Sequence, residues 1–242
     1  MLGLGSNLYS EGSQLEVSFS NNYSMSFDGT NDFIEVDGVV DNINSTTGTI
    51  AFWMKLPSVS ATGFIFRAQS GTSGSTDNLV QMIYHASSNQ MRISYKAEAG
   101  STRTAQIENG HTAIEGQGWK HFVGTWDISE PEIKIYMDGS LQDTNTGATE
   151  VFDASLSIAD IGRNAGSEAA PLEAEIDELA IFNTVVSASD LYNGGVVKDL
   201  SGESGLIAYY RFEEGSGTSA EDSSGNGNTG TISGATYSTD LP

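Results

Sequence analysis

The sequence predicts an all-β protein, an antiparallel β-sandwich, from two observations. Apolar and polar residues alternate with a period of two in short runs along most of the chain, which is typical of strands with one buried face and one face in water. Pairs of Asp or Asn followed by Gly separate these runs and predict turns, at residues 28–29, 37–38, 109–110 and 226–227. Sandwiches of roughly 200–250 residues commonly form one domain, so the 242 residues predict a single domain.

Two kinds of strand follow from the pattern. Runs with one apolar face predict strands that are half in water: residues 49–56, 91–96 and 133–137. Runs that are apolar on both faces predict central strands: residues 63–68, 79–86, 119–126 and 206–212.

One helix is expected, at residues 187–195, because Ser187 or Ser189 can cap its first turn and Asn193 with Gly194 can end it. Residues 213–234 are rich in Gly, Ser, Thr and Asn, a composition shared with flexible linkers. We interpret them as an ordered loop with a short strand at residues 229–232, because an apolar strand precedes them and a further run follows.

The composition limits the partners. There are 10 Lys and Arg residues against 32 Asp and Glu residues, a net charge of −22. Such a field repels phosphate backbones and anionic lipid surfaces, so we expect neither nucleic acid nor membrane as a partner. A negative surface also attracts cations, but the favoured interpretation is that the charge keeps the protein soluble. The absence of cysteine excludes disulfides and thiolate metal sites. The N-terminus shows no signal peptide, and no run of about 18 apolar residues occurs.

Four stretches carry a resemblance to a known family: SMSFDGTNDFIEV (24–36), GTIAFWMK (48–55), WKHFVGTWD with IKIYMDG (119–139) and EIDELAIFNTVVSASDLYNGG (175–195). In this order and spacing they resemble the laminin-G-like, concanavalin A-like lectin/glucanase superfamily. The resemblance implies an antiparallel jelly-roll β-sandwich, in agreement with the alternation.

The C-terminal stretch, residues 206–235, also resembles this superfamily, but in many members it precedes the FDG-like strand. We interpret the order as a circular permutation, which requires neighbouring chain ends. The expected organisation is one domain over residues 1–242, with an N-terminal arm at 1–20 and a C-terminal strand and loop at 205–242 packed on it. A similar arrangement occurs in virion proteins of tailed bacteriophages.

The resemblance implies a structural Ca²⁺ ion held by Asp28 and Asp177, with Asn31 and Asp32 as nearby oxygen donors. Calcium takes about six to eight oxygen ligands in such loops. In the alternative, Asp28 caps a turn and Asp177 accepts backbone hydrogen bonds.

The glucanase branch of the superfamily carries the carboxylate pattern E-x-D-x-E, or E-x-D-x-x-E with a bulge, in which two carboxylates act as nucleophile and acid. This chain offers Glu175 and Asp177, but Leu179 or Ala180 stands at the third position. Glu178 directly follows Asp177, and neighbours in a regular strand point to opposite faces. We therefore expect no catalytic residues and no enzyme.

Sugar binding commonly uses exposed aromatic rings. Trp126, Tyr84, Tyr136 and Trp53 are the candidate carbohydrate-binding platforms. The favoured alternative for the tryptophans is filling of the core, where large aromatics usually lie.

These observations lead to two functional hypotheses. The first is a non-enzymatic virion structural protein of a tailed phage, a capsid decoration or a tail or fibre component. It would assemble in the host cytoplasm as a homo-oligomer with other virion proteins, which agrees with the absence of cysteine and of a signal peptide. The alternative is a Ca²⁺-dependent, lectin-like module that contacts host surface glycans.

Overall fold

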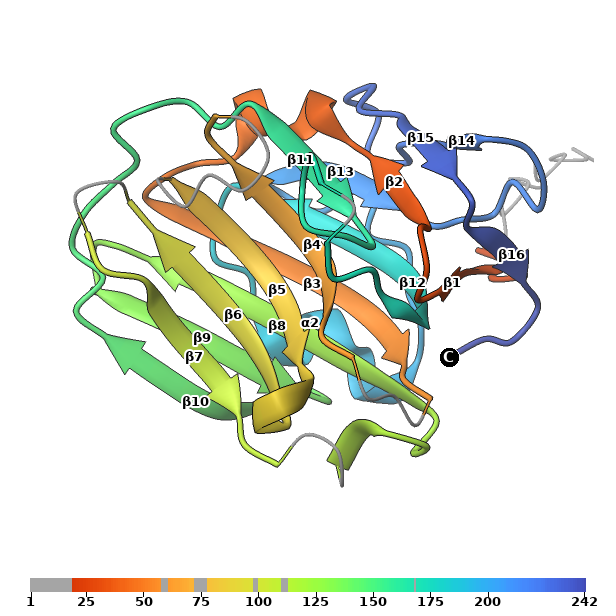
Figure 1. Cartoon of the computed structure of the whole chain (residues 1–242), viewed down its shortest axis with the longest axis horizontal. Coiled ribbons are helices and arrows are strands. Elements are labelled where there is room, and N and C mark those ends of the chain that lie inside the picture. The colour runs from red at the N-terminus through yellow and green to blue at the C-terminus, as the bar shows by residue number, and fades with distance from the viewer. Residues whose placement is uncertain (1–18, 58–60, 72–77, 98–99, 110–112, 168) are drawn as a thin grey trace, which may run out of the picture.

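The computed structural model describes residues 19–57, 61–71, 78–97, 100–109, 113–167 and 169–242. Two antiparallel β-sheets pack face to face, which confirms the predicted sandwich (Figure 1). Of the predicted N-terminal arm, residues 1–18 lie outside the described residues.

The first sheet, sheet A, has the strand order β10-β9-β8-β3-β12-β1-β16, and β13 also pairs with β12. Its strands are β1 (Ser24–Asp28), β3 (Thr47–Lys55), β8 (Trp119–Asp127), β9 (Glu132–Met137), β10 (Ser140–Thr146), β12 (Glu173–Phe182), β13 (Leu206–Tyr210) and β16 (Thr236–Ser238).

The second sheet, sheet B, has the order β14-β15-β2-β11-β4-β5-β6-β7 and lies in front of sheet A in Figure 1. Its strands are β2 (Phe33–Glu35), β4 (Gly63–Gln69), β5 (Leu79–His85), β6 (Gln90–Lys96), β7 (Arg103–Ile107), β11 (Ile158–Ile161), β14 (Ser219–Ala220) and β15 (Gly230–Ser233).

The predicted helix is present as α2 (Ala188–Tyr192), continued by the 3₁₀ turn η3 (Asn193–Gly195). Asn193 adopts a left-handed conformation at the end of α2, as its place before Gly194 predicts. Of two further 3₁₀ helices, η1 (Asp37–Asn42) replaces the turn predicted at residues 37–38, and η2 (Ala86–Ser88) begins at the last residue of the strand predicted at 79–86.

The main core lies between the two sheets and contains the large side chains Phe52, Phe66, Phe122, Tyr84 and Trp126. A second, smaller core lies on the outer face of sheet A. There, α2 and the segment that follows it cover Ala51, Val123 and Tyr209. The outer face of sheet A is therefore largely closed by its own chain.

The described chain ends lie side by side. Strand β16 pairs with β1, and the Ser24 hydroxyl donates to the carbonyl of Asp240 (2.7 Å). Strands β13 to β16 belong to the same two sheets as the rest of the chain. This proximity is what the interpretation as a circular permutation requires.

The packing of Trp126 on Gly48 gives a test of the core. The two residues are cross-strand partners, and a Cβ atom at Gly48 would lie 2.0 Å from Trp126 Cζ2. Because the ring is fully buried, we expect Gly48→Ala to lower the free energy of unfolding by about 1–3 kcal/mol, as overpacked cores do. Urea denaturation followed by circular dichroism measures the change.

Gly202→Ala is the matched control, because no atom lies within 4 Å of a Cβ at that turn position. Equal stability of the Gly48→Ala protein and the control would contradict this packing.

Candidate functional site

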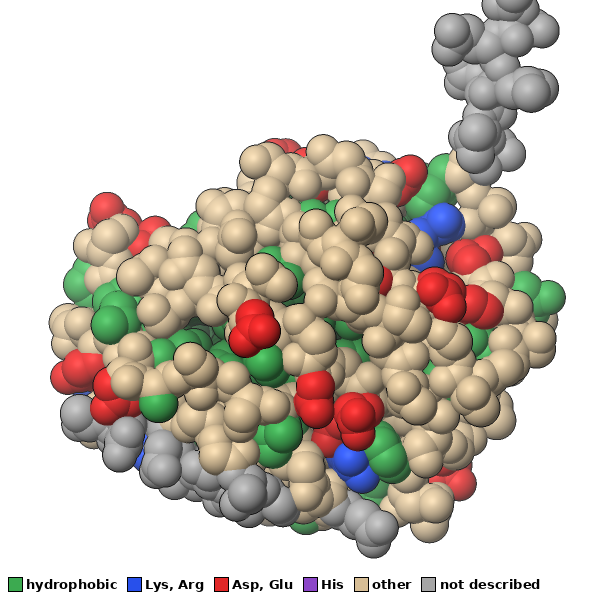
Figure 2. All heavy atoms as spheres, turned by 90° about the horizontal axis from the view of Figure 1, so that it is seen from above, with side chains coloured by type: hydrophobic (Ala, Val, Ile, Leu, Met, Phe, Trp, Pro, Cys, Tyr) green, Lys and Arg blue, Asp and Glu red, His purple; other side chains and the backbone are tan. Residues whose placement is uncertain are grey.

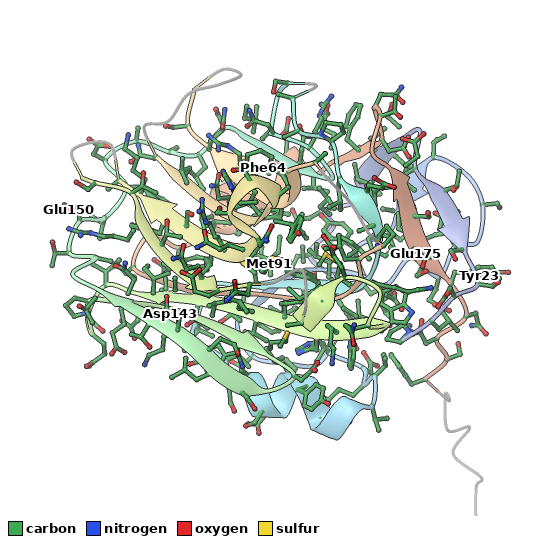
Figure 3. The ribbon with its side chains drawn as sticks, turned by 60° about the horizontal axis from the view of Figure 1, so that its bottom comes forward. Tyr23, Phe64, Met91, Asp143, Glu150 and Glu175 are labelled. Carbon is green, nitrogen blue, oxygen red and sulfur yellow. The ribbon has the colours of Figure 1, made fainter. Side chains whose placement is uncertain are left out.

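A cleft of about 490 Å³ opens where β1, β3 and β12 lie side by side. We call it the β12 cleft. Its lining residues are Ser26, Phe27, Asp28, Lys55, Leu56, Pro57, Gly116, Gly118, Glu173, Ala174 and Glu175. Glu175 and Tyr23 mark this side of the molecule in Figure 3. The volume lies within the range of roughly 300–1,000 Å³ that is usual for ligand pockets.

The lining combines an apolar surface with charged groups. Pro57 supplies exposed aliphatic surface, Leu56 and Ala174 are buried lining residues, and Asp28 and Glu173 are exposed carboxylates. A few polar groups converging on an apolar surface are the usual composition of a binding site. Nothing in the sequence singles out Lys55 or Glu173, because only the pairing of distant strands brings them to the same cleft as Asp28.

Lys55 is held in place by carboxylates on either side. Its ammonium group lies 3.2 Å from Glu175 Oε2 and donates to Asp240. The Trp119 indole also donates to Asp240 (2.9 Å), and Ser238 donates to Glu175 (2.7 Å). The last residues of the chain therefore fix one wall of the β12 cleft.

Asp28 ends β1 and behaves as the turn residue of the alternative prediction. Its Oδ1 accepts from the backbone N–H of Thr30 (2.8 Å), and its own N–H donates to Asp32 Oδ2 (2.9 Å). Asp32 is buried, and burial raises the pKa of its carboxyl group. Asn31 is exposed.

The donors predicted for calcium do not come together. Asp28 is the cross-strand partner of Glu173, four residues before Asp177 on β12, which separates the two aspartates by about 13 Å along the strand. Asp177 already accepts from Asn21 Nδ2 and the Glu178 N–H, both at 2.8 Å. Within the described ranges, no group of three or more His, Cys, Asp or Glu side chains could hold a metal ion. A single calcium site built from Asp28, Asp177, Asn31 and Asp32 therefore does not fit the structure.

Asp177 and Glu178 form a buried carboxylate pair, 0% and 3% exposed. A β-bulge interrupts the pairing of β12 with β3 after Asp177, and Glu178 has φ +52°. The Tyr209 hydroxyl donates to Glu178 Oε2, and Arg211 Nε lies 3.5 Å from Glu178 Oε1. The bulge thus turns Glu178 toward the outer face of sheet A, the face on which Tyr209 packs.

This arrangement corrects the expectation that Asp177 and Glu178 point to opposite faces. Strand alternation holds only for regular backbone, and the bulge places both carboxylates in one electrostatic cluster. Neither carboxylate is open to a substrate, because Asn21 and Arg211 lie against them. The absence of enzymatic activity stays a prediction.

The buried surroundings raise the pKa values of both carboxyl groups. Burial, opposed by the hydrogen bonds from Asn21 and the Glu178 N–H, raises the pKa of Asp177 to about 7. Burial and then the Asp177 charge raise the pKa of Glu178 to about 9. Near neutral pH, Glu178 is therefore protonated and Asp177 is partly protonated.

The four predicted aromatic platforms do not form one surface. Trp126 and Tyr84 are buried in the main core, where they donate to the Asn44 carbonyl (2.9 Å) and to Glu115 (2.8 Å). Trp53 is buried on the outer face of sheet A, with its ring centre 5.0 Å from that of His121. Core filling explains these three rings, and a sugar could not stack on them.

Tyr136 is half-buried on the outer face of sheet A. It lines a cavity of about 120 Å³ together with Lys134 and Val185. This volume is well below the range of roughly 300–1,000 Å³ for ligand pockets. Tyr136 is therefore separate from the β12 cleft, and its role in sugar binding stays a prediction.

The outer face of sheet B carries polar side chains in register across three strands, with Gln81, Ser94 and Thr104 in one row. Ser94 and Thr104 hydrogen-bond to each other (3.0 Å). Arg92 lies two residues before Ser94 on β6, on the same face, and donates to Gln90 and Ser88. This face is a second polar surface, on the opposite sheet from the outer face that α2 covers.

The buried pair predicts a loss of stability as the pH rises from about 4 to about 9. Both pKa values lie above those of the unfolded chain, so this contribution is fully present below about pH 4 and is lost as the pH rises through the folded pKa values. Because Glu178→Gln cannot ionise, its Tm should fall less than that of the unaltered protein. A proton bound only in the folded state contributes about 1.4 kcal/mol per pH unit.

Thermal unfolding at a series of pH values gives the comparison. Asp190→Asn, an exposed carboxylate on α2, is the control and should follow the unaltered protein. If the Tm of Glu178→Gln changed with pH as the Tm of the unaltered protein does, Glu178 would not hold a proton in the folded state.

None of the helices among the described residues has the length and hydropathy needed to span a bilayer. No curated protein sequence matches the chain. Among solved structures, a candidate carbohydrate-binding protein from Bacteroides ovatus is similar with a TM-score of 0.68 at 16% identity, over 93% of this chain and 62% of that chain.

Two shorter structures also match. The CBM40 of Ruminococcus gnavus IT-sialidase has a TM-score of 0.58 at 16% identity, over 71% of this chain and 95% of its own. A heptameric SAP-like pentraxin from Limulus polyphemus has a TM-score of 0.51 at 16% identity, over 72% of this chain and 82% of its own. At these identities the likeness shows the fold.

The family is shown by the sequence itself. The model of Laminin_G_3, described as concanavalin A-like lectin/glucanases superfamily, matches residues 28–191, which run from the end of β1 into α2. The resemblance found in the sequence and the two-sheet sandwich agree with this match, and the chain therefore belongs to the Laminin_G_3 family of the concanavalin A-like lectin/glucanases superfamily.

Proposed function

We propose that this protein is a carbohydrate-binding module and that its glycan lies in the β12 cleft. The observation that carries the proposal is the cleft itself, about 490 Å³ in volume, with carboxylates beside an aliphatic surface. No catalytic step is part of the proposal.

The lining suits the chemistry of a sugar. Hydroxyl groups of a sugar donate hydrogen bonds, and carboxylates such as Asp28 and Glu173 accept them. Lys55 can donate to a sugar oxygen while it stays paired with Glu175. Pro57 offers exposed apolar surface to the C–H groups of a ring.

The comparisons support this class of ligand. The Bacteroides ovatus protein is named as a candidate carbohydrate-binding protein, and the Ruminococcus gnavus CBM40 is described with bound α2,3-sialyllactose. Neither these structures nor the pentraxin is named as a virion protein. We therefore place glycan binding before the virion hypothesis.

Filling the β12 cleft should weaken glycan binding. Gly118 lines the cleft, has φ +81° and has no atom within 4 Å of a Cβ position. Asn tolerates this backbone region better than most residues, so Gly118→Asn adds a side chain at the cleft without a clash. We expect about a tenfold loss of affinity, equivalent to about 1.4 kcal/mol, by calorimetry with a glycan first identified on an array.

Gly194→Asn is the matched control, because Gly194 has φ +67°, equally open surroundings and a position in η3. Glycan binding should be unchanged in this variant. Two results would contradict the proposal: no binding of the unaltered protein to neutral, acidic or amine-bearing glycans, or equal binding by both variants.

A further inference from the structure

The β12 cleft is lined by more carboxylates than cationic side chains. Carboxylates reach it from three parts of the chain, Asp28 on β1, Glu173 and Glu175 on β12, and Asp240 beside Lys55. Lys55 is the one cationic side chain among the lining residues. On the face seen in Figure 2, acidic side chains form several separate groups with few basic ones among them, so the field around the protein has the same sign.

Asp28 and Glu173 are the unusual members of this set. They are direct partners across the β1–β12 pair, and like charges directly opposite each other destabilise a sheet. Gly29 lies under the Glu173 side chain, since a Cβ atom there would be 3.0 Å from Glu173 Cβ and 3.5 Å from Oε2. The Glu173 carboxylate is therefore held over the turn that Asp28 begins.

No ion pair among the described residues balances the charge of this pair. Among the ion pairs of the described residues, Lys55 pairs with Glu175 and Asp240, and none includes Asp28 or Glu173. One oxygen of Asp28 accepts from the Thr30 N–H, and both side chains are exposed. An ammonium group placed between them would form two charge-assisted hydrogen bonds and relieve their repulsion.

We propose that the β12 cleft selects glycans that carry a protonated amine, with the ammonium group between the carboxylates of Asp28 and Glu173. The exposed surface of Pro57 contacts the sugar ring, and Lys55 stays with Glu175. This inference rests on the proposed function and adds the class of glycan. An acidic sugar, such as the sialyllactose bound by the Ruminococcus gnavus CBM40, is repelled by the same pair.

The test compares three oligosaccharides of equal length by calorimetry at pH 6: a glucosamine trimer, its fully N-acetylated form and a uronic acid trimer. The first two share a backbone and differ in charge. We expect the glucosamine trimer to bind about tenfold more tightly than the acetylated trimer, because only its ammonium group forms charge-assisted hydrogen bonds with the two carboxylates. The uronic acid trimer should show no binding.

Because the net charge of −22 attracts any cation, two variants of equal charge separate the cleft from the general field. Asp28→Asn with Glu173→Gln should remove the preference for the amine. Asp190→Asn with Glu130→Gln, which changes two exposed carboxylates outside the cleft, should keep it.

The outcomes are distinct. Equal affinity for the amine and acetylated trimers overturns the inference and leaves glycan binding intact, whereas no binding of any glycan overturns the proposed function as well. If both double variants lose the preference for the amine, the preference comes from the net charge of the protein, and the inference is overturned as well. Displacement of the amine by Ca²⁺ at micromolar concentration would make the pair an inorganic cation site and contradict the selection of an amine.

Discussion

The structure depends on one constraint, the sharing of one edge of β12 by two strands. Strand β3 follows one edge of β12, while β1 pairs with residues 173–176 and β13 with residues 179–182 on the other edge. The backbone of Asp177 and Glu178 lies between these two partners and pairs with neither β1 nor β13. The bulge at Glu178, the Asn21 side chain and Arg211 fill this position. The two ends of the domain meet here because β1 and β13 must both reach β12.

The same sharing creates the β12 cleft. Since β1 pairs with the first part of β12, the end of β1 brings Asp28 opposite Glu173, and β3 brings Lys55 opposite Glu175. Strand β16 then extends the sheet beyond β1 and delivers Asp240 to Lys55. The buried pair and the cleft therefore lie on one strand but differ in environment. Asp177 and Glu178 are shielded and their pKa values are raised, whereas Asp28 and Glu173 are exposed and available to a ligand.

The alternating and apolar runs of the sequence predicted β3, β4, β5, β6, β8, β9 and β13, because burial of an apolar face is a local pattern. They did not predict the edge strands β7 and β10, whose sequences RTAQI and SLQDTNT are largely polar. Strand β11 is only four residues long, and a run of that length carries little periodicity. Motifs in the sequence predicted the family, but they did not predict the residues of the β12 cleft. Asp28 was selected for calcium with Asp177, and only the strand register shows that its partner is Glu173. Likewise, the assignment of Glu178 to the opposite face from Asp177 assumed a regular strand, and the bulge is a tertiary feature.

The central claim is that a glycan binds in the β12 cleft, and the direct measurement is an NMR titration of isotope-labelled protein with its glycan. The account predicts that the amide signals that shift belong to the end of β1, the first residues of β12 and the Gly116–Gly118 loop. Two regions should keep their signals unchanged: the outer face of sheet B around Arg92 and the cavity beside Tyr136. Shifts confined to either of those two regions would contradict the account.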